Sequence, residues 1–433
     1  PSRYFLENVD QYTESPVFCF LRNMPKGAHL HTHGIATGDF KKLAAYILKQ
    51  DNLYVWVGST TDLNTYGVFK YLRAIDIPEE EKEFWKFCSE FSLDFIYELI
   101  TMPKTVTSDE KTAPRPWADF QTLWFRIRFL SHTVRTWSGK DSFFWTILED
   151  QYRAGVTYIE FREILAAEFF NPYDRVDADV FLQAFADTVE LFKKENPDFL
   201  GAKVIFCALK IETRQQVKED ILLAIELKEM FPNYMAGFDL VGEEDTLKPL
   251  NDYTEELILC KTHGLPLFLH AGETLHTATA TQMYDAVAIG TRRMGHGYDL
   301  INHPSLLKQV LTDNIVIECC PISNQVLGYS ADLKNHNGKT MLRHGVKMTI
   351  SSDDAGMFHY HDPTYDWTAI VVAWGLDIFQ IKHLARQSFE CSTLGKEITG
   401  VAEKKFDIAW EKYIRKTLKL YADVLETCYL SEH

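Results

Sequence analysis

The sequence has few of the features that would place the protein in a membrane or in a disulfide-rich class. No run of about 18 to 20 apolar residues occurs in its 433 residues, so we expect no membrane-spanning helix. Its 8 cysteines include no CxxC pair, which argues against a disulfide framework. No Asn-x-Ser/Thr sequon is present, and the first residues, Pro-Ser-Arg-Tyr-Phe, carry no signal-peptide hydrophobic region.

Basic residues are also fewer than acidic residues. The 45 Lys and Arg residues face 61 Asp and Glu residues, which gives a formal net charge of −16 at pH 7. An acidic chain approaches a polyanion only at an electrostatic cost, so we expect no nucleic-acid partner and no anionic membrane surface. Hydrophobic residues make up 46% and charged residues 24% of the chain, which is typical of a folded globular protein.

Eight short β-rich runs end in polar or glycine residues. They occupy residues 28–33, 156–162, 203–207, 237–242, 266–271, 293–297, 315–320 and 347–353. From the third run onward they recur about every 25 to 35 residues, with helical patterns between them. Eight repeated βα units predict an α/β protein whose parallel sheet closes into a TIM (β/α)8 barrel.

The interval between the first and second runs is too long for a single crossover. We predict a mainly helical insertion over residues 34–154, with helices over 40–50, 79–102 and 117–137 and an extended stretch at 54–57. No Gly/Ser/Pro-rich linker brackets this insertion, so we expect one catalytic domain over 1–433. Residues 364–433 should form C-terminal helices that pack on the barrel.

Histidine and acidic residues stand where several predicted strands end. His31 and His33 alternate along one strand, so both imidazoles point to the same face. Together with His270 and Asp353 they form a nitrogen and oxygen ligand set suited to one Zn²⁺ ion, with a position left for water. Zinc would lower the pKa of that water toward about 7.

Glu273 and His296 lie at further strand ends and remain available for acid and base work. Taken singly, each such histidine or acid is more often a packed barrel residue or a helix N-cap. Their joint placement at the carboxyl ends of strands, which is the catalytic end of a TIM barrel, favours a metal-dependent hydrolase.

Five separated motifs resemble the adenosine deaminase family. They are MPKGAHLHTH at 24–33, HAGET at 270–274, GHG at 295–297, CPISNQVL at 320–327 and SDD at 352–354. GFDLVG at 237–242 and SSDD at 351–354 favour the adenosine deaminase 2 branch, also called the adenosine-deaminase-related growth factors. The resemblance implies hydrolytic deamination of a 6-aminopurine nucleoside or 5′-nucleotide, adenosine to inosine or AMP to IMP, with release of ammonia.

The resemblance also implies roles for the residues of these motifs. One zinc ion per chain would be held by His31, His33, His270 and Asp353. Glu273 would protonate N1 of the purine, and His296 would orient the attacking hydroxide. Asp353 would thus belong to both the metal site and the catalytic set.

Other matching positions imply contacts with the purine. Asp354 would hydrogen-bond N7, the backbone of Gly242 would meet N3, and Trp117 could stack on the purine or ribose or belong to the core. A two-metal hydrolase of this kind usually carries a lysine at the end of its fourth strand, but the fourth strand here ends Phe-Asp-Leu-Val-Gly, which favours a single metal ion.

Three positions around the expected sugar pocket depart from the family pattern. Gly34 stands where relatives carry an aspartate that meets the ribose 5′ end, Gln121 stands in place of a ribose-binding glutamate, and Glu243 replaces a histidine. The first two changes remove negative charge and bulk, so we hypothesise that AMP is accepted as well as, or in preference to, adenosine. Retention of adenosine as the preferred substrate is the alternative. Candidate phosphate contacts are His276, Thr277, Thr279, His359 and His361.

The compartment and the assembly stay open at this point. The resemblance implies an extracellular location and allows a homodimer, whereas the missing sequons and the single cysteine, Cys88, between residues 34 and 117 favour a cytoplasmic location as the alternative. A secreted growth-factor-like protein that acts by receptor binding, with deamination secondary, is the alternative function. The complete set of metal and acid–base residues argues against it.

Overall fold

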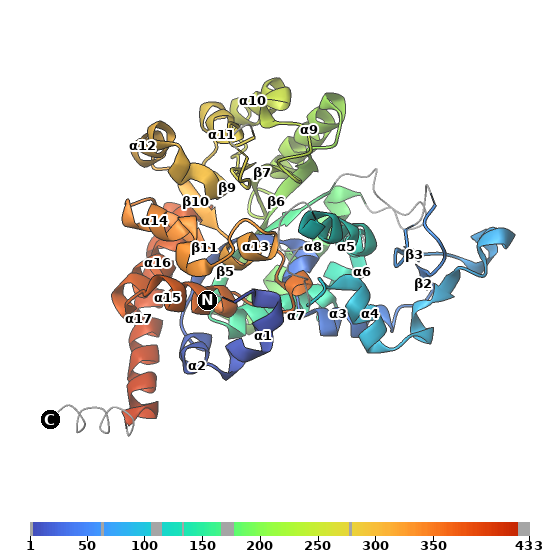
Figure 1. The fold of residues 1–433 in the computed structure, drawn as a ribbon, viewed down its shortest axis with the longest axis horizontal. Helices are drawn as coiled ribbons and strands as arrows, with labels where there is room; N and C mark the ends of the chain where they lie inside the picture. The colour runs from blue at the N-terminus through green and yellow to red at the C-terminus, as the bar shows by residue number, and fades with distance from the viewer. Residues whose placement is uncertain are drawn as a thin grey trace.

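The computed structural model describes residues 3–61, 65–104, 115–131, 134–165, 177–276 and 279–422. Eight parallel strands lie at its centre, each close to a predicted run (Figure 1). They are β1 (Gly27–His33), β5 (Val156–Glu163), β6 (Gly201–Leu209), β7 (Met235–Val241), β8 (His270–Ala271), β9 (Arg293–His296), β10 (Val316–Cys319) and β11 (Met348–Ile350).

The strands pair in chain order. One sheet has the order β1-β5-β6-β7 and a second has the order β11-β10-β9-β8, and all these pairs are parallel. Parallel bridges between Thr32 and Asp353 and between Phe238 and Leu267 connect the two sheets at both edges. The predicted TIM barrel is therefore confirmed, and the carboxyl ends of its strands face one common rim.

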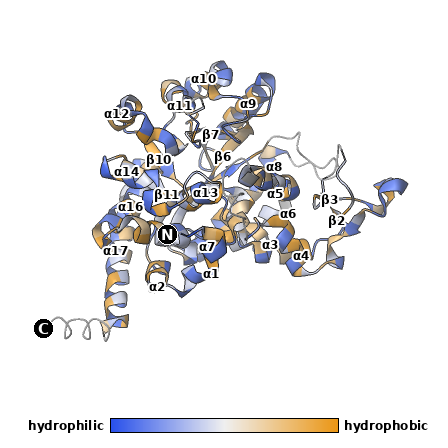
Figure 2. Ribbon diagram, in the orientation of Figure 1, coloured by the Kyte–Doolittle hydropathy of each residue, from blue (hydrophilic) through white to orange (hydrophobic). Residues whose placement is uncertain are grey.

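Helices surround these strands and cover their outer sides (Figure 1). Those that follow β5 to β10 are α8 (Ala178–Glu195), α9 (Arg214–Met230), α10 (Thr254–Thr262), α11 (Gln282–Ile289), α12 (Pro304–Asp313), α13 (Pro321–Val326) and α14 (Asn337–Arg343). Their ribbons carry both hydrophobic and hydrophilic residues, as expected of helices with one face on a sheet and one in water (Figure 2). Helix α9 begins with a capping box, in which Thr213 and Gln216 satisfy each other's backbone N–H groups.

The insertion after β1 is built from helices and a small antiparallel sheet. The helices are α3 (Phe40–Ile47), α4 (Leu93–Ile100), α5 (Arg115–Ser131), α6 (Val134–Trp137) and α7 (Phe143–Arg153), and the sheet joins β3 (Phe69–Tyr71), β2 (Leu53–Trp56) and β4 (Trp85–Phe87). The prediction of one helix over 79–102 was wrong in its first half, because Trp85 pairs with Trp56 in the small sheet. Aromatic residues with helical spacing fit a half-buried strand equally well.

Two helices precede the barrel and three close it. The chain starts with α1 (Phe5–Glu14) and α2 (Pro16–Arg22) and ends with α15 (Thr364–Trp374), α16 (Ile378–Cys391) and α17 (Lys396–Leu420). One hydrophobic core extends from Phe5 to Tyr413, and a second small cluster lies around Trp56 and Trp85 in the insertion. Among the described helices, none is long and apolar enough to span a bilayer.

Candidate metal and active site

The candidate site lies at the carboxyl ends of the barrel strands. His31 and His33 come from β1, His270 opens β8, His296 ends β9 and Asp353 follows β11. His296 and Asp353 both have a φ of 60°, a left-handed conformation that non-glycine residues adopt rarely and mostly where surrounding structure enforces it. The barrel thus holds these two side chains in place through its backbone as well as through packing.

Four imidazoles surround the Asp353 carboxylate. Its Oδ1 lies 3.2 Å from His31 Nε2 and 3.1 Å from His33 Nε2, and its Oδ2 lies 3.8 Å from His296 Nε2. The His31 and His270 ring centroids are 4.6 Å apart. His31, His270, His296 and Asp353 place four donor atoms within 4.8 Å of one another, and His33 joins Asp353 and Asp354 in an overlapping group.

Several atoms of this cluster are buried without a hydrogen-bond partner. Among the described residues, they include His31 Nε2 and Asp353 Oδ1. A buried polar atom without a partner costs about 1–3 kcal/mol. Although burial opposes it, the adjacent imidazoles of His31 and His33 hold the pKa of Asp353 well below its usual range, and burial lowers the pKa of His270 to about 4. An ionised carboxylate and neutral imidazoles are the forms that bind a divalent metal ion.

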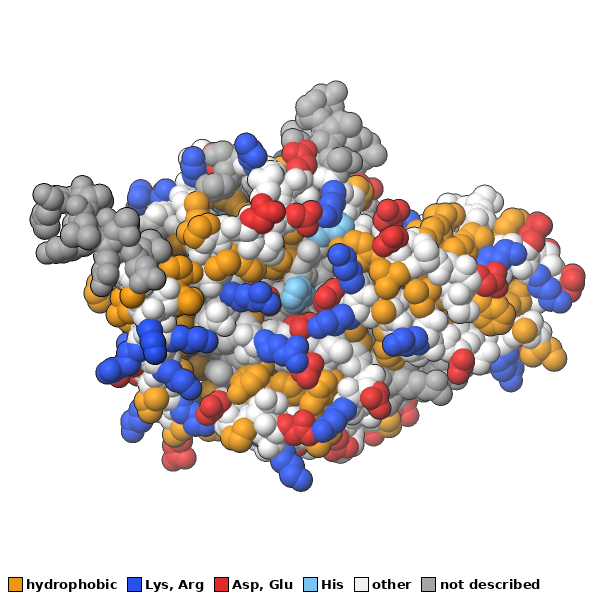
Figure 3. All heavy atoms as spheres, turned by 90° about the horizontal axis from the view of Figure 1, so that it is seen from below, with side chains coloured by type: hydrophobic (Ala, Val, Ile, Leu, Met, Phe, Trp, Pro, Cys, Tyr) orange, Lys and Arg blue, Asp and Glu red, His pale blue; other side chains and the backbone are white. Residues whose placement is uncertain are grey.

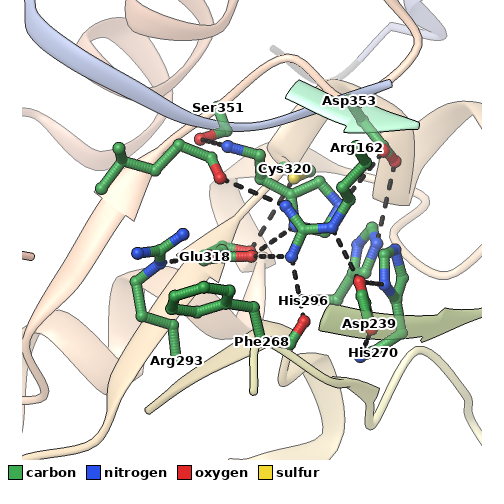
Figure 4. Close-up of polar contacts among 12 residues, drawn as sticks. Arg162, Asp239, Phe268, His270, Arg293, His296, Glu318, Cys320, Ser351 and Asp353 are labelled. Atoms are coloured by element: carbon green, nitrogen blue, oxygen red, sulfur yellow. Dashed lines mark hydrogen bonds and ion pairs between the residues drawn. The ribbon is translucent and has the colours of Figure 1, made fainter. Parts of the chain in front are cut away.

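The far sides of two of these histidines rest on a buried ionic network, here called the floor and made of Glu160, Arg162, Asp239, Arg293 and Glu318. Figure 4 shows Arg162, Asp239, Arg293 and Glu318 of this network. His31 Nδ1 lies 2.7 Å from Glu318 Oε2, and His270 Nδ1 lies 2.6 Å from Asp239 Oδ2. Arg162 donates to both carboxylates, at 2.6 Å and 2.7 Å. Because each Nδ1–H faces a carboxylate, each Nε2 keeps its lone pair for a metal ion.

Two carboxyl groups of the site have raised pKa values. Burial raises the pKa of Glu273 and of Asp354 well above the ordinary range, and the negative charge of Asp353 adds to both shifts. Glu273 Oε1 and Asp354 Oδ1 are buried and make no hydrogen bond among the described residues. Both groups can therefore hold a proton near neutral pH and donate it to an acceptor in the site.

A cavity of about 330 Å³ opens onto the metal cluster. Its lining includes Glu273, Asp354 and Gly242, which the sequence assigned to the purine. Helix α5 of the insertion contributes a stripe at helical spacing, which consists of Trp117, Phe120, Gln121, Trp124, Phe125 and Arg128. The structure thus brings the predicted purine contacts and three of the four predicted metal ligands, His33, His270 and Asp353, to one cavity.

The sugar-pocket hypothesis assumed that Gly34 leaves empty space, and this assumption was wrong. A Cβ atom on Gly34 would lie 1.3 Å from Glu163 Oε1, so the Glu163 carboxyl already fills that volume. Glu163 ends β5, is 4% exposed and lines the cavity. Burial raises the pKa of Glu163 well above the ordinary range. A carboxyl group therefore still occupies the place of the expected aspartate, but it is mostly uncharged.

Gln121 and Glu243 also line the cavity and lie close together, with Gln121 Nε2 3.5 Å from Glu243 Oε2. Carboxyl groups from β5 and from the segment after β7 therefore remain in this wall. Glu163 was missed because nothing in a sequence links the end of the second barrel strand to the residue after His33. Parallel pairing of β1 with β5, which aligns His33 with Arg162, brings them together.

Most of the candidate phosphate contacts lie elsewhere. His276 has a side chain that is 71% exposed and lies 3.8 Å from Asp245, and neither His276 nor Thr279 lines the cavity. His359 is held by Tyr97 and by the carbonyl of Met102, away from the cavity lining. His361 is also absent from that lining, and Thr277 lies outside the described residues.

A (β/α)8 barrel that carries three or four histidines and an aspartate at its carboxyl rim is a metal-dependent hydrolase of the amidohydrolase type. Comparison with known proteins gives the family. The family model described as adenosine deaminase matches residues 98–401, so the chain belongs to the adenosine deaminase family. Human adenosine deaminase 2 is 29% identical over 96% of this chain and 83% of its own length, in agreement with the predicted branch.

Solved structures share the fold. The N6-methyl-AMP deaminase of Arabidopsis thaliana superposes with a TM-score of 0.66 at 15% identity, over 91% of this chain and 99% of that one. An amidohydrolase from Burkholderia ambifaria with bound zinc gives a TM-score of 0.64 at 15% identity, over 93% and 96% of the two chains.

Proposed function

We propose that the protein deaminates a 6-aminopurine nucleoside by zinc-dependent hydrolysis, with adenosine converted to inosine and ammonia. The observation that carries the proposal is the juxtaposition, in one cavity, of the ligand cluster around Asp353 with two buried carboxyl groups of raised pKa, Glu273 and Asp354. Family membership supports the same reaction. A receptor-binding role as the main activity is not favoured, because the catalytic residues are complete.

The donor set fits zinc. His31, His33 and His270 would supply nitrogen ligands and Asp353 an oxygen, which is a combination that zinc binds with an open position. When bound, zinc supplies the nucleophile by lowering the pKa of a water molecule toward about 7. The unpartnered His31 Nε2 and Asp353 Oδ1 support this assignment, because the ion would satisfy both atoms.

The protein's own residues then handle the purine and its protons. A protonated Glu273 can donate to ring nitrogen N1, which makes C6 more electrophilic, and a protonated Asp354 can donate to N7. The Gly242 backbone, in a left-handed conformation at φ 122°, lies on the cavity wall where N3 would approach. Trp124 covers the site from α5, with its ring centroid 6.1 Å from that of His33, and helps to exclude water.

AMP is the second candidate substrate, and one observation favours it. Arg128 lines the same cavity, lies over the Phe125 ring at 5.2 Å and forms no ion pair with a carboxylate among the described residues. An unpaired guanidinium at a cavity edge is a natural partner for a phosphate group.

The test measures the conversion of adenosine to inosine by the change in ultraviolet absorbance. The assay is run first without a chelator, then with one, and finally after zinc has been added back. Loss of activity with the chelator and recovery with zinc are expected, and deamination that survives complete metal removal would overturn the proposal. AMP should be assayed in parallel by kcat/KM.

Replacement of the proposed proton donor is the sharper test. Glu273→Gln keeps the size of the side chain but cannot shuttle a proton, so kcat should fall by about 10²- to 10⁴-fold. Glu255→Gln, an exposed glutamate paired with Arg214, is the matched control and should keep wild-type kcat. Wild-type activity in Glu273→Gln would remove this residue from the mechanism.

A further inference from the structure

We propose that His336 and Asn324 are positioning residues that fix the ring proton of His296 on Nε2, so that this imidazole donates a hydrogen bond into the site instead of binding the metal ion. The proposal goes beyond the deaminase activity, since it concerns how one ring is held. It rests on the proposed function only for its kinetic test.

The chain of hydrogen bonds begins at a backbone amide. The N–H of Gly338 donates to His336 Nδ1 at 3.0 Å. A backbone N–H can only donate, so His336 Nδ1 must accept, and a neutral imidazole that accepts at Nδ1 carries its proton on Nε2. Burial lowers the pKa of His336 to about 3, which keeps the ring neutral.

The direction of this bond fixes the next two. His336 Nε2 lies 3.1 Å from Asn324 Oδ1, and Asn324 Nδ2 lies 3.2 Å from His296 Nδ1. A flipped Asn324 amide would set its N–H against the N–H of His336, so Oδ1 must face His336 and Nδ2 must face His296. His296 Nδ1 therefore accepts a hydrogen bond, and the proton of the neutral ring is on Nε2.

The side chains that form this series of hydrogen bonds are tightly packed, so they cannot turn to exchange partners. Asn324 is 0% and His336 1% exposed. The His336 ring packs against Tyr298 and Trp374, with centroids 5.0 Å and 5.7 Å away, and the Asn324 carbonyl accepts from the N–H of Tyr329. Since bulk water does not reach these groups, an incorrect proton placement would leave two donors facing each other in the interior, at a cost of about 1–3 kcal/mol.

The same logic separates His296 from the proposed ligands. The Nδ1 atoms of His31 and His270 face the carboxylates of Glu318 and Asp239, which are acceptors, whereas Nδ1 of His296 faces an amide donor. A histidine whose Nε2 carries the proton has no lone pair there for a metal ion. Within the group formed by His31, His270, His296 and Asp353, His296 would then point a proton, and not a lone pair, toward the Asp353 carboxylate, 3.8 Å away.

One competing group must be considered. Glu273 Oε1 lies 3.4 Å from His296 Nδ1 and could accept a proton placed there. Glu273 Oε1 nevertheless forms no hydrogen bond among the described residues, and a proton on Nδ1 would oppose the Asn324 amide. The fixed Asn324 amide therefore places the His296 proton on Nε2 and not on Nδ1. This holds while His296 and His336 both stay neutral.

The direct test is the imidazole ¹⁵N–¹H spectrum of the zinc-loaded protein labelled with ¹⁵N-histidine, with His296→Gln and His336→Gln used for assignment. Both His296 and His336 should give the pattern of a neutral ring protonated on Nε2. An Nδ1–H pattern for His296 in the wild-type protein would overturn the proposal, whatever reaction the protein catalyses.

The kinetic test uses Asn324→Asp, which keeps the shape but replaces the donor toward His296 with an acceptor. The His296 proton should move to Nδ1, and kcat should fall by about 100-fold, the usual cost of one lost donor in an active site, while KM changes by less than about threefold and zinc content is retained. Asn337→Asp makes the same chemical change in the same segment, where the side chain donates to the Tyr298 carbonyl and not to a histidine, and should leave kcat unchanged. Wild-type kcat in Asn324→Asp would contradict the proposal, and the spectrum of the wild-type protein decides the matter if this variant does not fold.

Discussion

The floor beneath the metal ligands and the wall that faces the substrate are built in opposite ways. In the floor, Arg162 and Arg293 are 2% and 0% exposed and donate to the carboxylates of Glu160, Asp239 and Glu318 at 2.5 to 2.7 Å. The wall is formed by one face of α5 together with Glu163 and Glu243, and its closest polar contact between these elements, from Gln121 to Glu243, is 3.5 Å long.

The difference assigns different tasks to the two regions. In the floor, each charged side chain has several partners, and these fix the direction of the ligand lone pairs. Replacement of one charged residue would leave the opposite charges of its partners buried without compensation. A wall with few mutual contacts tolerates substitution, since little is lost when one side chain changes. Gly34, Gln121 and Glu243, which we expect from the sequence resemblance to depart from the family pattern, all belong to the wall or contact it. The two regions can be told apart by substitutions of matched chemistry.

Arg162→Met should have the largest effect. It would leave Asp239 and Glu318 buried beside each other without their shared cation, at a cost of about 3–5 kcal/mol in the free energy of unfolding. Arg128→Met in the wall should cost less than about 1 kcal/mol. Chemical denaturation measures the free energy of unfolding of both variants. Equal decreases in this free energy would show that floor and wall do not differ as described.

The floor also predicts the response to acid. Although burial opposes it, Arg162 and its neighbours lower the pKa values of Glu318 and Asp239, and so these acids stabilise the fold above their unfolded pKa of about 4. That contribution should be lost as the pH falls below about 4, and the loss should be smaller in Arg162→Met. Unfolding followed between pH 7 and pH 2 in both proteins checks this.

Asp239→Asn should have the next largest effect, and its effect on metal affinity is the one that tests the role of His270. It weakens the acceptor for His270 Nδ1–H, and zinc affinity should fall by about 10- to 100-fold. Asp299→Asn is the matched control, because Asp299 also pairs with a histidine at 3.0 Å, and that histidine, His303, is not among the proposed ligands. Competition with a chromogenic chelator gives both affinities; an unchanged affinity in Asp239→Asn would argue against His270 as a ligand.

Glu163→Ala tests the wall, where selectivity should change more than stability. Removal of the carboxyl empties the space beside Gly34, so kcat/KM for AMP relative to adenosine should rise by about tenfold, and Glu163→Gln, which keeps the bulk, should change this ratio little at pH 7. An identical response of the two variants would mean that the volume at this position does not limit the substrate.

Arg128→Gln should have the smallest effect and one confined to the nucleotide. If Arg128 contacts a phosphate group, kcat/KM for AMP should fall by about three- to tenfold while that for adenosine is maintained. A parallel fall for both substrates would instead indicate a role in packing α5 over the cavity.

The sequence predicted the barrel and the rim residues well, because each signal was local. His31 and His33 alternate within one strand, and the strand runs repeat along the chain. The floor could not be predicted in the same way, since Arg162, Asp239 and Glu318 come from three strands and their meeting depends on the register of the closed barrel. Glu163 and the hydrogen bond from Asn324 to His296 were missed for the same reason: the contacts of Gly34 with Glu163 and of Asn324 with His296 join residues far apart in sequence.

The stripe of α5 has a consequence for how this enzyme could be altered. Trp117, Gln121, Trp124 and Arg128 lie on one helix of the insertion, and none of them takes part in a strand of the barrel. Part of the substrate-facing wall is therefore carried by a piece of chain separate from the strands that hold the proposed reaction residues. A single exchanged helix could retarget the cavity toward another purine derivative, while the barrel that performs the deamination is left as it is.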